Sequence, residues 1–300
     1  MCYTCAWTIY EHGETPRKGD LMRCDGRKLK KISPMYRVVP HIMVERHDSM
    51  NMTTLNLPME PMQRYIRGKA AEGVVISHMA LILAAYLRTM AEFPALNRFV
   101  VNRKVYAHKD VTVSLVVLKA NSMDDETMSK VHLSVEDTIF DVQKKILHYI
   151  DENRKYSTEN STDKMIDTLT RIPGLLRFGV SFLKFLDKHG WLPKKIVELS
   201  PFHASLLITN LASIRTNHIY HHVYDFGTTS VSMALGNQRE VPRRTASGEI
   251  VFDRCLPVGL VMDERIAQGS YFARAFHVFK RYIKNPALLE EPPKVINIDE

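Results

Sequence analysis

A short charged turn, Asp263-Glu264-Arg265, gathers the side chains of this sequence that are best suited to acid–base chemistry. The largely apolar residues 250–262 predict a strand before the turn, and the periodicity of residues 271–283 predicts a helix after it. A glutamate at such a position can act as a general base when burial raises its pKa, to about 8–9 in documented cases. Glu264 is therefore a candidate base.

A second group of reactive side chains lies in residues 218–225, which include His218, His221, His222 and Asp225. Histidine and carboxylate are common metal ligands, but a single loop cannot supply a closed tetrahedral set without partners elsewhere. No cysteine pattern supports a metal here, and His218 and His222, although four residues apart, lie in a predicted loop and not on a helix. We therefore predict no metal site, and we interpret the run as loop residues that are hydrogen-bonded at a subunit contact.

Composition narrows the class of protein. The 300 residues are 45% hydrophobic and carry a formal charge of +8, enough chain for a domain with a sizeable core. Four scattered cysteines exclude a disulfide framework, and Cys2-x-x-Cys5 leaves a metal or redox role as the less favoured alternative. No signal peptide or apolar run of membrane-spanning length is present, so we expect a cytoplasmic protein.

The positive charge suits nucleic acid, a membrane surface or a phosphate-bearing ligand. Its densest run, residues 17–31, contains no aromatic side chain and is typical of a solvated tail. We therefore expect no nucleic-acid partner, and we do not favour contact with a membrane.

The elements expected to position these residues follow from periodicity, caps and prolines. Residues 1–32 form a flexible lead-in, residues 33–290 one domain with a helical insertion at about 164–200, and residues 291–300 a tail. Ser77 and Pro94 bracket a strongly apolar helix, and residues 156–163 form a polar linker. The remaining elements are a helix from Ser33-Pro34, strands over 50–57, 99–106, 111–118, 131–135, 204–211 and 226–236, helices over 59–69 and 136–154, and a hairpin over 239–249.

The insertion contains a very apolar stretch, residues 172–186, which carries two cations. Three interpretations stay open: a helical hairpin packed on the core, a lid over an acyl pocket, and a membrane-surface helix. The packed hairpin is the favoured one.

The turn and its flanking elements resemble the signature of the coenzyme A-dependent acyltransferases. This superfamily includes chloramphenicol acetyltransferase and the catalytic core of the 2-oxo-acid dehydrogenase complexes. Its signature is a strand, then Asp-His-Arg-x-x-Asp-Gly, then a helix. Asp263, Arg265 and Gly269 match it, whereas Glu264 replaces the catalytic histidine and Gln268 replaces the second aspartate.

Two further stretches carry the resemblance. Residues 93–97 are similar to an aromatic-Pro-x-Leu-Asn sequence that ends a core helix in the dehydrogenase acyltransferases. Residues 204–211 resemble a strand that ends in Ile-Ser/Thr-Asn-Leu-Gly, in which Thr209 and Asn210 match. The resemblance implies that the Thr209 hydroxyl donates to the oxyanion of the tetrahedral intermediate, a contribution of roughly 2.7–4 kcal/mol in other enzymes. The alternative is an ordinary β-branched strand residue.

The exchange of histidine for Glu264 has a cost that can be approximated. A free histidine lies about two pKa units below a thiol acceptor and a free glutamate about four, so proton transfer becomes harder by roughly 3 kcal/mol. Burial of Glu264 would reduce this difference, and a nearby cation such as Arg265 would oppose that change.

The resemblance implies a two-layer α/β sandwich with a mixed β-sheet and helices, as in chloramphenicol acetyltransferase. It also implies a homotrimer with active sites at the subunit interfaces, where Glu264 faces Thr209 of the next chain. The substrate would be a coenzyme A thioester, with no bound prosthetic group. Two functions follow: a standalone acyltransferase with an unknown acceptor, or a catalytically degenerate homologue that binds a ligand or serves assembly.

Overall fold

The computed structural model describes residues 23–118, 126–155 and 174–299. Cys2, Cys5 and the linker predicted at residues 156–163 lie outside these ranges. The main sheet has the strand order β2-β10-β8-β7-β5-β6, with β9 paired to β10. The strands are β2 (Met50–Pro58), β5 (Val111–Leu118), β6 (Glu126–Leu133), β7 (Leu206–Asn210), β8 (Val231–Leu235), β9 (Arg239–Arg244) and β10 (Ile250–Asp263).

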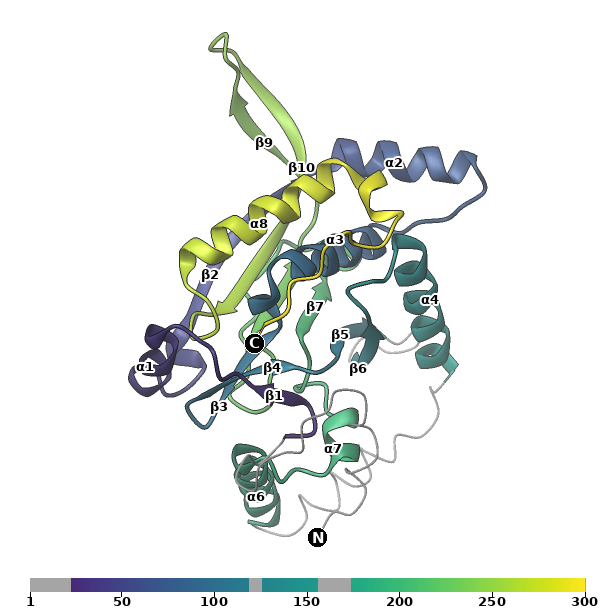
Figure 1. The fold of residues 1–300 in the computed structure, drawn as a ribbon. Helices are drawn as coiled ribbons and strands as arrows, with labels where there is room; N and C mark the ends of the chain where they lie inside the picture. Colours follow the sequence, from purple (N-terminus) through teal and green to yellow (C-terminus); the bar gives the residue numbers. More distant parts are fainter. Residues whose placement is uncertain (1–22, 119–125, 156–173, 300) are drawn as a thin grey trace.

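This sheet is mixed, as predicted. Strands β5, β7 and β8 run parallel to one another, and the other pairs are antiparallel. Helices pack on one face and give the predicted two-layer sandwich (Figure 1). They are α2 (Met59–Ala71), α3 (His78–Glu92), α4 (Ile139–Lys155) and α8 (Gly269–Lys284).

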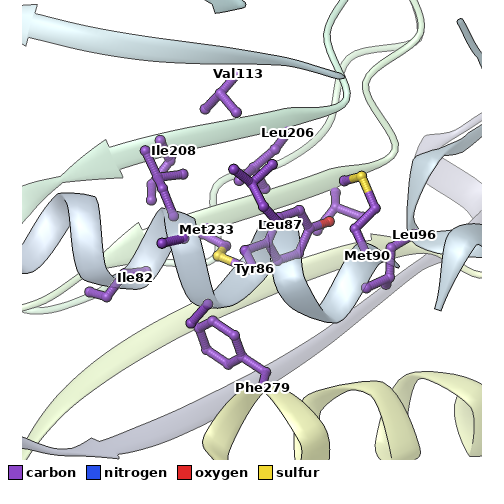
Figure 2. Packing of buried hydrophobic residues seen from close by; sticks show 14 of the residues in the cluster. Ile82, Tyr86, Leu87, Met90, Leu96, Val113, Leu206, Ile208, Met233 and Phe279 are labelled. Atoms are coloured by element: carbon purple, nitrogen blue, oxygen red, sulfur yellow. The ribbon is translucent and has the colours of Figure 1, made fainter. Parts of the chain in front are cut away.

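Helix α3 is the centre of the core. It lies between strand β7, which carries Leu206 and Ile208, and helix α8, which contributes Phe279 (Figure 2). The Ser77 side chain accepts a hydrogen bond from the Ala80 amide at 3.1 Å and caps the helix. Because α3 has neighbours on most sides, its residues 80–91 are all buried, and it reads as apolar all round.

A smaller sheet, β1-β4-β3, corrects two predictions. Strands β3 (Arg98–Val101) and β4 (Lys104–His108) form a tight hairpin through Asn102 and Arg103, whose φ angles are 50° and 58°. Two positive φ angles in a two-residue loop suit hairpin formation. The predicted single strand over residues 99–106, paired with 111–118, is therefore wrong. The flexible lead-in is also wrong for residues 26–28, because Gly26–Lys28 forms β1 against β4.

The predicted helical insertion contains α6 (Leu175–His189) and α7 (Lys194–Leu199). The favoured prediction was that its apolar side chains pack on the core. Not all of them do, since Phe178, Phe182 and Phe185 are 68%, 50% and 48% exposed. Figure 1 shows α6 away from the main helical layer. No helix in the described ranges combines the length and apolarity needed to cross a bilayer.

The two chain ends of the domain also adopt defined contacts. Helix α1 (Pro34–Ile42) begins at Pro34 as predicted, although the Ser33 side chain makes no capping hydrogen bond. The predicted tail lies against the domain, because the Asn297 amide donates to the Ala91 carbonyl at 2.8 Å and Asp299 pairs with Arg98.

Candidate active site

The end of β10 holds a buried ionic network centred on Asp263, here called the Asp263 network. The Asp263 carboxylate accepts hydrogen bonds from Ser49 Oγ at 2.8 Å and from Arg265 Nε and Nη2 at 2.9 and 2.8 Å. Arg46 Nε lies 3.4 Å from the second oxygen. All four side chains are buried. A charge-assisted, bidentate network of this kind defines the conformation of the turn that follows.

Arg46 and Ser49 were not recognised as site residues from the sequence. They lie in the charged segment between α1 and β2, which is typical of a solvated loop. In the structure the Arg46 guanidinium donates to the Val100 and Gly227 carbonyls at 3.3 and 3.2 Å, besides its ion pair with Asp263. Nothing in the local pattern signals this burial, because every partner is distant in the chain.

Glu264 lies in the turn that follows Asp263, next to this network. Its amide donates to the Ser49 carbonyl at 2.8 Å, and its side chain is partly exposed. The Arg265 guanidinium donates to Asp263 and to the Val44 carbonyl. The charge of Arg265 is thus paired with Asp263.

Gln268 and Gly269 begin helix α8. The Gln268 side chain is exposed and forms no capping hydrogen bond, while its amide donates to Tyr36 Oη at 3.2 Å. A Cβ atom added to Gly269 would meet nothing within 4 Å. This glycine matches the acyltransferase signature, but its surroundings here would accept a larger residue.

Thr209 and Asn210 end β7. The Thr209 side chain is 6% exposed, and its hydroxyl has no hydrogen-bond partner in the part of the chain that the structure describes. Asn210 is exposed, and its carbonyl accepts from Ser213 Oγ at 2.6 Å.

The strand register separates Thr209 from Glu264 within one chain. Thr209 pairs with Ala234 on β8, and Ala234 pairs with Gly259 on β10. Gly259 precedes Glu264 by five residues, which corresponds to about 17 Å along the strand direction. The two candidate catalytic residues therefore stand near opposite ends of β7 and β10, two strands that β8 separates.

A cavity of about 540 Å³ adjoins the start of β2. Met50 lines it and is the register partner of Asp263, so the cavity lies beside the Glu264 turn. His47 Nδ1 lies 2.8 Å from Asp225, and this hydrogen bond raises the pKa of His47. The lining residues are His47, Met50, Lys184, His222, Val223, Tyr224, Asp225 and Phe226.

The predicted loop over residues 218–225 is confirmed, and several of its contacts are within the chain. His218 Nε2 and Tyr220 Oη lie 3.0 and 2.7 Å from Thr54 Oγ1. The loop crosses β10 so closely that a Cβ atom at Gly259 would lie 2.0 Å from the Ile219 carbonyl oxygen. Within the described ranges, no three His, Cys, Asp or Glu side chains are grouped to hold a metal ion.

Comparison with known proteins shows similarity at the level of structure. No family model matches the sequence, and no curated protein matches it either. The cubic core of the pyruvate dehydrogenase multienzyme complex aligns with a TM-score of 0.55 at 12% identity, over 87% of this chain and 93% of that one. Chloramphenicol acetyltransferase aligns with a TM-score of 0.50 at 11% identity, over 87% and 98%.

A third similar structure is dihydrolipoamide acetyltransferase from Azotobacter vinelandii, with a TM-score of 0.55 at 12% identity, over 87% of this chain and 93% of that chain. A serine, a histidine and an asparagine have a role in the catalytic mechanism of that enzyme, and the histidine precedes the asparagine by four residues. These alignments and the mixed sheet with its single helical layer show that this chain has the fold shared by dihydrolipoamide acetyltransferase and chloramphenicol acetyltransferase.

Proposed function

We propose that this protein transfers an acyl group from a coenzyme A thioester to an acceptor, at sites shared between the subunits of a homotrimer. Glu264 of one subunit takes the proton of the attacking thiol or hydroxyl. Thr209 of the next subunit donates a hydrogen bond to the oxyanion that forms on the thioester carbonyl.

The observation that carries this proposal is the unpaired hydroxyl of Thr209. More than nine in ten buried polar groups in proteins have a hydrogen-bond partner, so an exception calls for an explanation. Thr209 Oγ1 is buried, without a partner among the described residues, and stands at the end of a rigid strand. A donor held in this way is available to a group that arrives with the substrate.

The Glu264 turn supplies the second component. The Asp263 network holds the backbone immediately before Glu264, and the Glu264 amide is bonded to Ser49. Glu264 precedes Gln268 by four residues, the spacing between the histidine and the asparagine of the A. vinelandii enzyme. If Glu264 takes the place of that histidine, Gln268 takes the place of that asparagine and supplies another side-chain amide.

The distance between the two components supports a site that is shared between subunits. A residue pair separated by about 17 Å along the strand direction cannot act on one thioester. If a neighbouring copy brings its Thr209 to the Glu264 turn, every interface contains one complete site. The assembly of a similar fold into the cubic core of a dehydrogenase complex supports this arrangement.

The alternative function is that of a catalytically degenerate homologue that binds a ligand or serves assembly. The replacement of the expected histidine by Glu264 favours it, since the change makes proton transfer to a free glutamate harder by roughly 3 kcal/mol.

The deciding experiment measures thiol release from a panel of acyl-coenzyme A thioesters. We expect turnover in the wild type, a loss of about 10²–10³-fold in Thr209→Ala, and retention of much of the rate in Thr209→Ser, which keeps a hydroxyl. We expect Glu264→Ala to be inactive. Subunits of Glu264→Ala and Thr209→Ala, unfolded and refolded together, should regain activity, because mixed trimers contain interfaces with both intact residues.

Each other outcome has a definite meaning. Turnover that is unchanged in Glu264→Ala refutes the assignment of the base. An absence of recovery in the mixed subunits, with both variants folded and trimeric, refutes the shared site. An inactive wild type whose Glu264→His variant is active establishes the degenerate homologue.

A further inference from the structure

The exposed side of α6 presents an unbroken aromatic surface. Phe178, Phe182 and Phe185 follow one another at spacings of four and three residues, so they form one stripe of the helix. The Phe178 and Phe182 rings stack with centroids 6.1 Å apart, and Phe185 meets Trp191 edge-on at 6.0 Å. We call these four side chains the aromatic ridge.

The end of α6 is built so that Trp191 completes the ridge. Gly190 adopts a φ of 73° and ends the helix, and the Trp191 amide donates back to the Leu186 carbonyl at 2.8 Å. This pattern is a Schellman cap, which turns the chain back against the last helical turn. Trp191 is 52% exposed although it has the ring of Phe185 as a neighbour.

A second stripe of α6 is positively charged. Arg177, Lys184 and Lys188 recur at spacings of seven and four residues and are all exposed. The acidic residue of the helix, Asp187, is buried and points into the domain. The exposed surface of α6 therefore combines aromatic side chains with cations and presents no acid.

The helix is held firmly in this orientation. Asp187 Oδ1 lies 2.6 Å from Arg23 Nη2 and 3.2 Å from His203 Nε2, and Asp187 Oδ2 accepts from the Gly227 amide at 3.3 Å. These partners come from three other parts of the chain and are themselves within the domain. The ion pairs fix one side of α6, so that the ridge faces outward.

We infer that α6 docks the protein onto the surface of an anionic lipid bilayer, with the aromatic ridge in the headgroup region and the three cations against lipid phosphates. Helices that lie in a membrane interface share this composition: Phe or Trp on one side and Lys or Arg on the other. The cations favour an anionic lipid surface over a second copy of this chain, whose own α6 carries the same charges.

This inference is independent of the acyl transfer proposed above. None of the ridge side chains is among the residues that line the cavity beside the Glu264 turn, although Lys184 on the neighbouring stripe is. Substitutions in the ridge should therefore leave thiol release unchanged when vesicles are absent. That measurement separates a failure of lipid docking from a failure of the proposed reaction.

The test is co-sedimentation of the full chain with vesicles of phosphatidylcholine alone and of phosphatidylcholine mixed with phosphatidylglycerol. We expect the wild type to sediment with the anionic vesicles only. Phe178→Ser/Phe182→Ser/Phe185→Ser should weaken binding by at least about tenfold per side chain. Lys184→Glu/Lys188→Glu, which keeps the ridge, should weaken it by about fivefold for each cation lost.

The matched control is Ile250→Ser/Phe252→Ser in the β9–β10 hairpin. These two apolar side chains are 67% and 63% exposed, about as much as the ridge, but they lie on the protruding hairpin rather than on α6. Binding by the control should equal that of the wild type. In a Trp7→Phe background, emission of Trp191 should shift to the blue on addition of anionic vesicles.

Three results would overturn the inference. The first is a wild type that stays in the supernatant with both kinds of vesicle. The second is a control that loses binding as much as the ridge variant. The third is a wild type that does not bind vesicles, together with a ridge variant that forms a smaller oligomer than the wild type. That result would mean that a second copy of the chain covers this face.

Discussion

Replacement of Asp263 by asparagine should destabilise the protein strongly, because it removes a buried carboxylate that neutralises two buried arginines. Asparagine has the same shape and can still accept from Ser49, so the change isolates the charge. Arg46 and Arg265 would stay in the interior without a counter-charge. Breaking a buried ion pair in this way costs about 3–5 kcal/mol, which is a large part of the 5–15 kcal/mol typical of whole domains.

The assay is urea unfolding followed by circular dichroism, with the free energy of unfolding taken from the midpoint at constant slope. The same strand provides a control: Asp253 pairs with Arg243, but their side chains are 41% and 58% exposed. Asp253→Asn should leave the midpoint unchanged, because exposed ion pairs contribute little. If Asp263→Asn and Asp253→Asn behave alike, the Asp263 network does not stabilise the turn and our account of the Glu264 position fails.

Two further predictions concern acid and glycine. Burial lowers the pKa of His108 to about 4. Burial opposes the ionisation of Asp187, but the hydrogen bond from His203 and the charge of Arg23 lower the pKa of Asp187 to about 2. As the pH falls, the unfolded chain binds a proton at each of these two residues before the folded chain does. The stability should therefore fall by on the order of 3 kcal/mol between about pH 6.5 and 4, through His108, and fall again between about pH 4 and 2, through Asp187. A His108→Gln variant that loses as much stability as the wild type between pH 6.5 and 4 contradicts this. Gly259→Ala should lower the melting temperature, because the added Cβ would lie 2.0 Å from the Ile219 carbonyl oxygen. Gly269→Ala is the control and should leave the melting temperature unchanged or raise it, because the added Cβ would meet nothing within 4 Å. Equal melting temperatures for the two variants would refute the close approach of the loop to Gly259.

The elements with strong local signals were predictable from the sequence. Helix α3 has a capping serine at its start, a proline after its end and an apolar pattern between them, and each of these signals acts within a few residues. The β3–β4 hairpin was missed for the opposite reason. Asn102 and Arg103 adopt positive φ angles without a glycine, so the two-residue turn leaves only a weak trace in the sequence.

The residues of the candidate site likewise fall into those that local sequence signals could predict and those that they could not. The order of strand, charged turn and helix around Asp263 could be predicted, because it is continuous in the chain. Arg46 could not, since a charged residue in a polar segment shows no sign of the partners that bury it, which stand 54 to 217 positions away in the sequence. The roles of Thr209 and Glu264 stay predictions, which the mixed-subunit experiment tests.

Strand β10 passes through two very different environments along its 14 residues. Its first half belongs to an exposed two-stranded ribbon with β9, and its second half is buried between β2 and β8. Amide hydrogens in residues 250–254 should therefore exchange through local fraying, whereas those in residues 256–262 should exchange only when the whole domain opens. A single continuous strand thus spans nearly the full range of local stabilities in the molecule. The turn at residues 245–248 is accordingly a place where a protease could cut, or a tag could be inserted, without disturbing the core.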